Sequence, residues 1–227
     1  MKIIFVTLFP DLIKCYFEDS ILKKAKQKAV FEIEFVNFRV YVQNKYNRVD
    51  TPLVGGGAGM IIDNVALRNA LVDLKLKYPE SKTIFLTPVA KKFNQKDAVR
   101  LSNEKVLILV CGRYEGFDER LIEDFADEVL SIGDYILTGG ELGALVIADA
   151  VLRNVKGVLG NSESLKGESF ESNLLEPPQF SKTGEVPQIL KSGNHAKIKE
   201  WQNSLAIQKT KFHRPDLISA GGNGLLK

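Results

Sequence analysis

The chain has 227 residues, of which 44% are hydrophobic and 26% charged, with a formal net charge of +3. This composition is typical of a globular chain with one large or two modest domains. No apolar run reaches the roughly 18 residues of a membrane span, and Pro10 and Asp11 interrupt the apolar N-terminus where a signal peptide would continue, so we expect a cytoplasmic protein that makes no membrane contact. Cys15 and Cys111 are too few for a disulfide framework or a zinc cluster, and both are predicted to be buried.

Strands and helices are predicted to alternate along the first 160 residues. Branched and aromatic residues indicate strands at 3–9, 31–38, 83–89, 105–111 and 127–132. Helical spacing of apolar residues predicts helices at 10–27, 64–77, 95–101, 117–125 and 142–152. Several of the strands are apolar throughout, as in a sheet covered on both faces. The pattern therefore favours the α/β class with a parallel-core sheet.

The pattern changes after Gly160. NSESLKGESFESN is polar and lacks a strand pattern, EPPQF and EVPQIL contain prolines, and a helical period returns in HAKIKEWQNSLAIQKT. We predict a first domain over residues 1–160, a flexible linker over 161–172 and a small helical domain over 173–227. The last part carries eight Lys or Arg and four acids. This asymmetry fits an anionic partner such as nucleic acid and fits a solvated helix face equally well.

Three loops lie where a predicted strand gives way to a helix or a turn: FLTPV (85–89), CGRYEG (111–116) and SIGDYILTGGE (131–141). GGGAGM fails the G-x-G-x-x-G pattern and Gly-Lys never occurs, which disfavours a dinucleotide dehydrogenase and a P-loop enzyme. Ligands of parallel sheets bind at the carboxyl ends of the strands, where glycine lets the backbone approach closely. The loops suit a flat ligand such as an adenine nucleoside, although each loop alone is also typical of an ordinary turn.

Five segments together carry a resemblance to a known family: LVCGRYEGFDER, SIGDYILTGGE, VGGGAGM, SGNHAKIKEW and RPDL. They resemble segments of the bacterial tRNA (guanine-37-N1)-methyltransferases of the SPOUT class. The resemblance covers essentially the whole chain, and the segments follow one another along it in the same order as in that family. The resemblance implies an α/β fold with a parallel-core sheet and a deep C-terminal trefoil knot, followed by a small all-helical C-terminal domain. It also implies S-adenosylmethionine as cofactor, tRNA with guanine at position 37 as substrate, and a homodimer with composite active sites.

The resemblance further implies which residues form the sites. The cofactor would be bound by Leu86, Thr87, Pro88, Gly112, Tyr114, Glu115, Gly116, Ile132, Gly133, Asp134, Tyr135, Ile136, Leu137, Gly139 and Gly140. The target guanine would be held by Asp50, Gly57, Gly59 and Glu115, although Asp50 is also typical of a cap. Neither histidine has the partner spacing of a metal site, so no metal ligand is predicted. The sequence does not indicate whether Mg²⁺ assists the reaction.

Methylation of guanine N1 needs two charged groups. Removal of the N1 proton moves negative charge onto O6, so a carboxylate base and a cationic donor would serve. Glu168 and Arg153 match the family's functional positions for these roles. The family's usual base is an aspartate followed by Ser-Phe, whereas Glu168 precedes Ser169 and Phe170 here, and we interpret it as a replacement. Two alternatives stay open: a SPOUT ribose 2′-O-methyltransferase and an RNA-binding module without activity.

Overall fold

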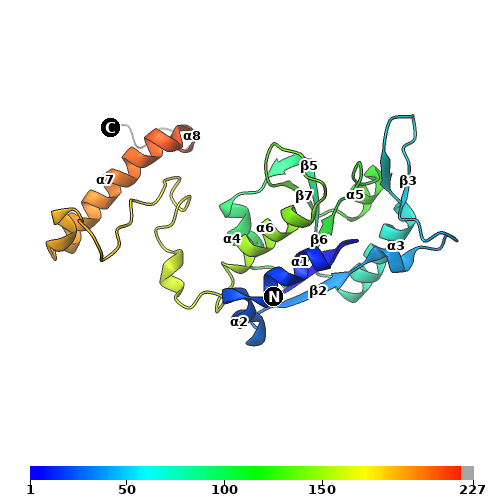
Figure 1. Cartoon of the computed structure of the whole chain (residues 1–227), viewed down its shortest axis with the longest axis horizontal. Coiled ribbons are helices and arrows are strands. Elements are labelled where there is room, and N and C mark those ends of the chain that lie inside the picture. Colours follow the sequence, from blue (N-terminus) through cyan, green and yellow to red (C-terminus); the bar gives the residue numbers. More distant parts are fainter. Residues whose placement is uncertain (221–227) are drawn as a thin grey trace. The chain divides into compact units, whose positions relative to one another are not determined.

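The computed structural model describes residues 1–220, apart from the side chains of Ser162, Ser219 and Ala220. The chain forms two compact units, which divide between Gly160 and Asn161. In the first unit, five parallel strands form one sheet in the order β2-β1-β6-β5-β7 (Figure 1). The strands are β1 (Lys2–Val6), β2 (Glu32–Val36), β5 (Lys82–Lys92), β6 (Val106–Cys111) and β7 (Glu128–Ser131). The predicted α/β sheet with a parallel core is confirmed.

Helices cover both faces of this sheet because its strands are apolar on both sides. Ile3 and Phe5 of β1 belong to one buried cluster, with α1 (Asp11–Lys14), α2 (Ser20–Gln27), α4 (Gln95–Leu101) and α6 (Glu141–Leu152). Ile4 and Val6 belong to the other cluster, with α3 (Asn64–Lys77) and α5 (Glu119–Phe125). The Asp63 carboxylate caps α3 by accepting from the backbone N–H groups of Val65 and Ala66.

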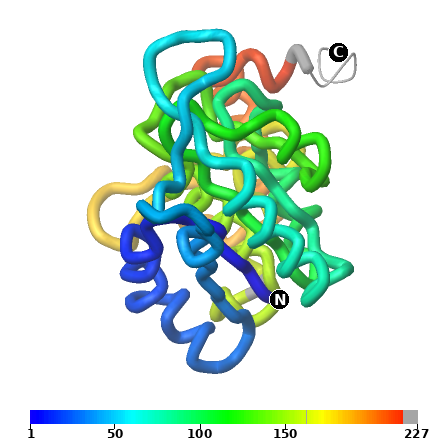
Figure 2. The backbone as a smooth tube through the Cα atoms, turned by 90° about the vertical axis from the view of Figure 1, so that its right-hand side faces the viewer, coloured from blue at the N-terminus to red at the C-terminus, as the bar shows by residue number. Residues whose placement is uncertain are grey.

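A small antiparallel hairpin protrudes from the first unit between β2 and α3. Its strands are β3 (Asp50–Pro52) and β4 (Met60–Ile62), and its loop stands clear of the neighbouring helices in both views (Figures 1 and 2). The sequence did not predict these strands, because three residues are too few to show a period of two. The connection needs glycine at Gly57, where φ is +127°.

The predicted helix over 10–27 is wrong, since three short elements replace it: α1, the 3₁₀ helix η1 (Cys15–Glu18) and α2. Ser20 has φ +58°, and its N–H donates to the Asp19 carboxylate at 2.6 Å, a local bond that ends the first helical run. Cys15 is exposed, so its predicted burial is also wrong; it lies two residues from both Ile13 and Phe17, whose buried side chains occupy the opposite face of the helical turn. Cys111 is buried as predicted, and burial raises the pKa of its thiol.

Over residues 161–220, the second unit contains the 3₁₀ helices η3 (Ser162–Leu165) and η4 (Gln188–Lys191), followed by α7 (His195–His213) and α8 (Pro215–Ala220). Asn194 caps α7, because its side chain accepts from the Lys197 N–H at 3.1 Å. The chain before these helices lies along α7, where the Leu175 N–H donates to Thr210 Oγ1 at 2.8 Å. Over residues 1–220, no helix combines the length and the apolar character required to traverse a bilayer.

Candidate active site

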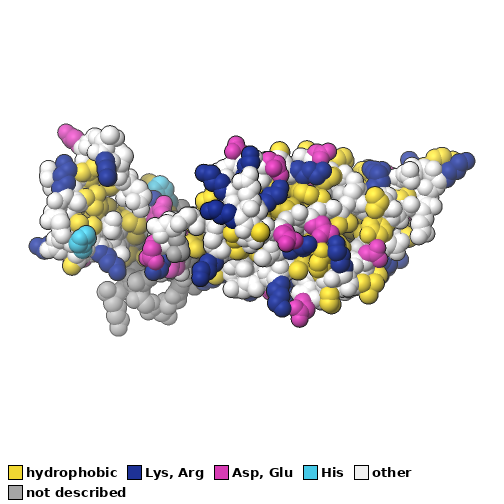
Figure 3. Space-filling view, turned by 90° about the horizontal axis from the view of Figure 1, so that it is seen from below, with side chains coloured by type: hydrophobic (Ala, Val, Ile, Leu, Met, Phe, Trp, Pro, Cys, Tyr) yellow, Lys and Arg dark blue, Asp and Glu magenta, His cyan; other side chains and the backbone are white. Residues whose placement is uncertain are grey.

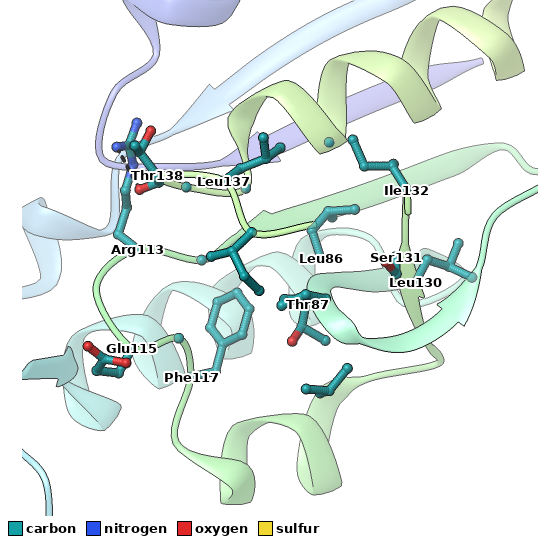
Figure 4. A pocket seen from close by; sticks show the side chains of 18 of the residues that line it. Leu86, Thr87, Arg113, Glu115, Phe117, Leu130, Ser131, Ile132, Leu137 and Thr138 are labelled. Atoms are coloured by element: carbon teal, nitrogen blue, oxygen red, sulfur yellow. Dashed lines mark hydrogen bonds between the residues drawn. The ribbon is translucent and has the colours of Figure 1, made fainter. Parts of the chain in front are cut away.

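A cavity of about 370 Å³ opens beside an irregularity within β5, at the carboxyl end of β7 and beside the loop that follows β6 (Figure 4). This volume lies within the range of small-molecule sites. The cavity is lined by all but one of the residues predicted to bind the cofactor: Leu86, Thr87, Pro88, Gly112, Tyr114, Glu115, Gly116, Ile132, Gly133, Tyr135, Ile136, Leu137, Gly139 and Gly140. The exception is Asp134, whose carboxylate pairs with Lys92 at the surface.

The first wall of the cavity comes from an irregularity in β5. The pairing of β5 with β7 breaks between Leu86 and Lys91, so the residues between them leave the ladder. Thr87 and Pro88 line the cavity from this bulge. The predicted strand ended at residue 89, but β5 resumes its pairing and continues through Lys92.

The second and third walls are the loops 112–116 and 133–140, which touch each other directly. The Gly140 N–H donates to the Gly112 carbonyl at 2.8 Å. A Cβ atom on Gly140 would lie 2.7 Å from the Gly112 nitrogen, closer than real Cβ contacts allow. Glycine at 140 is therefore required for the backbones of the two loops to meet.

A tight turn shapes the loop 133–140 where it leaves β7. The Ser131 hydroxyl donates to the Gly133 carbonyl at 3.0 Å and accepts from the Gly133 N–H at 3.2 Å. The Tyr135 hydroxyl donates to the Ile132 carbonyl at 3.1 Å, and a Cβ atom on Gly133 would collide with the Tyr135 ring. The turn thereby fixes Ile132 on the cavity wall, beside Leu86 (Figure 4).

A buried ion pair that the sequence reasoning missed joins the two loops behind the cavity. Glu141, the first residue of α6, is 2% exposed, and its Oε2 lies 3.0 Å from Arg113 Nε. These two atoms lack the alignment of a hydrogen bond, so the contact is an ion pair. Glu141 Oε1 accepts from the Thr7 hydroxyl at 2.7 Å, and Arg113 Nη1 donates to the Thr138 carbonyl at 3.2 Å (Figure 4). The sequence feature that could have revealed this ion pair is the presence of opposite charges in two glycine-rich motifs, GRYEG and TGGE.

The residues predicted to hold the guanine lie on the hairpin and on the adjoining loop. Asp50 is half-buried in β3 opposite Ile62, and Gly57 lies in the hairpin loop. The Glu115 N–H donates to the Met60 carbonyl at 2.9 Å, which attaches β4 to the loop 112–116. A Cβ atom on Gly59 would lie 2.5 Å from Glu115 Oε1, so the Glu115 carboxylate occupies the space that a side chain would need. The structure thus places Glu115 between the hairpin and the cavity.

The two predicted catalytic residues belong to different units. Arg153 is half-buried at the end of α6, where its N–H donates to the Asp149 carbonyl at 2.9 Å. Glu168 is half-buried in the second unit, in a turn whose Glu171 N–H donates to the Glu168 carbonyl at 3.3 Å. In the same turn, the Ser169 hydroxyl accepts from the Glu176 N–H at 3.1 Å. The meeting of Arg153 and Glu168 at one site stays a prediction.

The parallel sheet and its cavity define an α/β protein whose cavity has the volume of a small-molecule site. The family model for tRNA (guanine-1)-methyltransferase TrmD matches residues 1–220. The chain therefore belongs to the tRNA (guanine-1)-methyltransferase family, and the resemblance inferred from the motifs is confirmed.

Individual relatives agree with the family model. The tRNA (guanine-N(1)-)-methyltransferase of a Nitratiruptor species is 54% identical over 222 residues, which cover 95% of this chain and 97% of that protein. The protein of the same name from Sulfurimonas denitrificans is 54% identical over 223 residues, 96% of each chain. The one from Campylobacter jejuni is 52% identical over 227 residues, 96% of this chain and 97% of that protein. The predicted enzyme class is confirmed by these matches.

Proposed function

We propose that the protein transfers the methyl group of S-adenosylmethionine to N1 of the guanine at position 37 of tRNA, next to the anticodon, in the cytoplasm. The observation that carries this proposal is the position of the cavity. It gathers the residues predicted for the cofactor and adjoins, through Glu115, the hairpin predicted to receive the guanine. The names of the relatives, tRNA (guanine-N(1)-)-methyltransferases, support the same reaction.

The residues of the cavity fit S-adenosylmethionine. Leu86, Ile132 and Leu137 offer apolar surface for the two faces of an adenine ring. Gly116 lines the cavity with φ +104°, and a Cβ atom there would meet nothing within 4 Å, so the missing side chain leaves space for a ligand against the backbone. When bound, the cofactor supplies an electrophilic methyl group.

The fold proposed around this cavity is the SPOUT fold, in which the C-terminal part of the sheet forms a deep trefoil knot, an exception to the rule that connections do not thread loops. The direct contact between Gly140 and Gly112 supports this proposal, because a tightened knot requires glycine where its strands cross. We assign residues 1–160 to the methyltransferase domain, 161–172 to the linker and 173–227 to an all-helical tRNA-binding domain.

The chemistry assigned to the protein is alignment and proton removal. Asp50, Gly57, Gly59 and Glu115 hold the guanine after it leaves the base stack. Glu168 takes the N1 proton as general base, and Arg153 stabilises the charge that develops on O6. Alignment of the guanine with the methyl donor contributes up to roughly 7 to 11 kcal/mol in well-oriented systems.

The proposed assembly is a homodimer in which the second unit of one chain completes the active site of the other. Exposed apolar side chains at helical spacing support an interface on the first unit: Leu12 and Tyr16 on α1 and η1, and Leu142 and Val146 on α6. α1 and α6 pack against each other, so the two exposed apolar pairs lie on neighbouring helices. Exposed apolar surface of this kind is typical of an isologous interface.

Methyl transfer to two tRNA transcripts, with guanine or adenine at position 37, tests the function. Labelled S-adenosylmethionine is the donor, and the product nucleoside is identified after nuclease digestion. We expect 1-methylguanosine from the guanine transcript and no product from the adenine transcript. A ribose-methylated nucleoside would indicate a 2′-O-methyltransferase, and cofactor binding without any product would indicate an RNA-binding module.

A further inference from the structure

A basic loop borders the hairpin on the side of its first strand. We use this name for Arg39 together with the segment Asn44–Arg48, which contributes Lys45 and Arg48. The sequence from Phe38 to Val49 contains no acidic residue, and the three cationic side chains are exposed. Lys and Arg side chains gather at the right-hand tip of the molecule in Figure 3, the end to which this part of the chain extends in Figure 1.

The cations of the basic loop differ from most others of the first unit in having no acidic partner. Elsewhere the basic side chains are largely neutralised by ion pairs, such as Lys75 with Asp127. Within the described part of the chain, Arg39, Lys45 and Arg48 form no ion pair. Their charge is therefore available to an anionic partner.

The backbone of the basic loop is held in one shape. Asn44 Oδ1 accepts from the N–H groups of Tyr46 at 3.2 Å and Arg48 at 2.9 Å, and Asn44 Nδ2 donates to the Arg48 carbonyl at 2.8 Å. Arg39 Nη1 donates to the Asn47 carbonyl at 3.0 Å. A loop already ordered loses less conformational entropy when it binds a partner.

The basic loop is attached directly to the proposed guanine pocket. Val49, which separates Arg48 from Asp50, is 1% exposed, and its carbonyl accepts from the Asp63 N–H at 2.7 Å. Two residues of extended chain span at most about 7 Å, so Arg48 and Asp50 are neighbours in space. A ligand at Arg48 therefore lies next to whatever Asp50 holds.

The basic loop also presents an aromatic ring. Tyr46 is 76% exposed, and the Lys45 ammonium lies 5.9 Å from the centre of its ring. Single-stranded nucleic acids are commonly held by this combination, because cations replace phosphate counterions while a flat ring stacks on an unpaired base.

We propose that the basic loop is an RNA-contact surface for the nucleotides beside the target guanine. Lys45 and Arg48 bind backbone phosphates, and Tyr46 stacks on an unpaired base of the anticodon loop. The proposal rests on the proposed function, since it places the tRNA of that reaction on named residues of the first unit. Arg39 and Asn44 act as positioning residues, because their bonds fix the loop.

Equilibrium binding of the tRNA transcript by Lys45→Gln, Arg48→Gln and Tyr46→Ala, over a range of salt concentrations, tests the proposal. Each cation variant is expected to weaken binding and to reduce the slope of log K against log salt by about one. Tyr46→Ala is expected to weaken binding roughly 5- to 150-fold with an unchanged slope, because only stacking is lost.

Lys28→Gln is the matched control. It removes one exposed positive charge that, within residues 1–220, forms no ion pair, and it lies directly after α2, outside the cavity lining and the hairpin. The control is expected to bind tRNA like the wild type. Wild-type affinity and wild-type salt slope in all three loop variants, with active wild-type enzyme, would overturn the RNA-contact surface. An inactive wild-type enzyme would instead overturn the proposed function, while the binding data would still decide the surface.

Discussion

The carboxylate of Glu141 holds a position that links three separate parts of the first unit. It contacts Arg113 of the loop 112–116 and Thr7 after β1, while its own residue begins α6 directly after the loop 133–140. The Arg113 guanidinium also lies 4.4 Å from the centre of the Phe9 ring. The pair formed by Glu141 and Arg113 fixes the distance between the two cavity loops. If the loops moved apart, each of the two charges would lose its compensating partner.

Glu141→Gln should therefore destabilise the protein by about 3 to 5 kcal/mol, since Arg113 loses its buried counterion. Cofactor affinity should also fall, because the two loops lose their link. Urea unfolding and calorimetry with S-adenosylmethionine measure the two effects. The double variant Arg113→Met with Glu141→Leu should recover much of the stability, because apolar replacement of both charges removes the desolvation cost. A Glu141→Gln variant as stable as the wild type would refute the structural role of the pair.

Glu168→Gln should slow methyl transfer by roughly a hundredfold to ten-thousandfold, the usual effect of losing a general base, while cofactor affinity stays nearly unchanged. Glu168→Asp should keep part of the rate, because it restores a carboxylate of shorter reach. Higher pH should partly rescue Glu168→Gln by ionising N1 in solution. Single-turnover transfer to the guanine-37 transcript across pH is the measurement. Equal rates for Glu168→Gln and wild type near neutral pH would show that Glu168 is not the general base, and Glu115 or Asp50 would become the next candidate.

Among the elements, the loop 133–140 tolerates change least where it crosses Gly112. Gly140→Ala should abolish cofactor binding, because the new Cβ atom would collide with backbone atoms that have no room to move. Gly160→Ala is a matched control, since a Cβ atom there meets nothing within 4 Å. Calorimetry with S-adenosylmethionine should show binding for Gly160→Ala and wild type only. Tight binding by a folded Gly140→Ala variant would contradict the assignment of the cavity.

The helix α5 depends on a charged cap at its first turn. Asp118 accepts from the Arg120 N–H at 3.0 Å and from Arg120 Nε at 2.8 Å. The hydrogen bonds from Arg120 hold the pKa of the Asp118 carboxyl far below its ordinary value. A carboxyl whose pKa is lowered by folding stabilises the protein at every pH above the pKa that this carboxyl has in the unfolded chain, near 4. The stabilisation is lost as the pH falls from there toward the pKa of the folded state.

Asp118→Asn should therefore be less stable than the wild type near pH 7, and the difference should shrink below about pH 4, where the Asp118 carboxyl becomes protonated in the unfolded chain but stays ionised in the folded one. Urea midpoints measured from pH 3 to pH 7 give both curves. Parallel curves over the whole range would show that the charge of Asp118 contributes nothing.

The elements that the sequence predicted correctly are those with a strong local pattern, such as the apolar run of β6 and the capped helix α3. The misses have physical reasons. Asp19 and Ser20 form a local bond that interrupts an otherwise helical apolar pattern, and β3 and β4 are stabilised by the neighbouring loop through Glu115 and Gly116. The link between Glu141 and Thr7 joins residues 134 positions apart, and no local pattern indicates such a contact. The residues that line the cavity were predicted through the family resemblance, which rests on motifs and does not depend on periodicity.

At the scale of the whole molecule, the proposed composite site predicts complementation between two inactive variants. If Arg153 of one chain works with Glu168 of the other, a heterodimer of Arg153→Ala and Glu168→Gln chains contains one site with both residues intact. Random mixing should then restore about a quarter of the wild-type activity, because half of the dimers are mixed and each has one working site. No recovery from chains that demonstrably exchange would place both residues in the same chain. Sedimentation that shows only monomers would contradict the dimer itself.

The strand order also has a consequence for how the protein folds as it is synthesised. β1 pairs along one edge with β2, which is close in sequence, but along its other edge with β6, so that Lys2 lies beside Val106. A ribosome adds about 5 to 20 residues per second, so the unpaired N–H and C=O groups along one edge of β1 wait roughly 5 to 20 s for their partner strand. Contacts of such long range make folding slow. β1 is therefore exposed to aggregation during synthesis until β6 has been made, and a chaperone would have to protect it over that time.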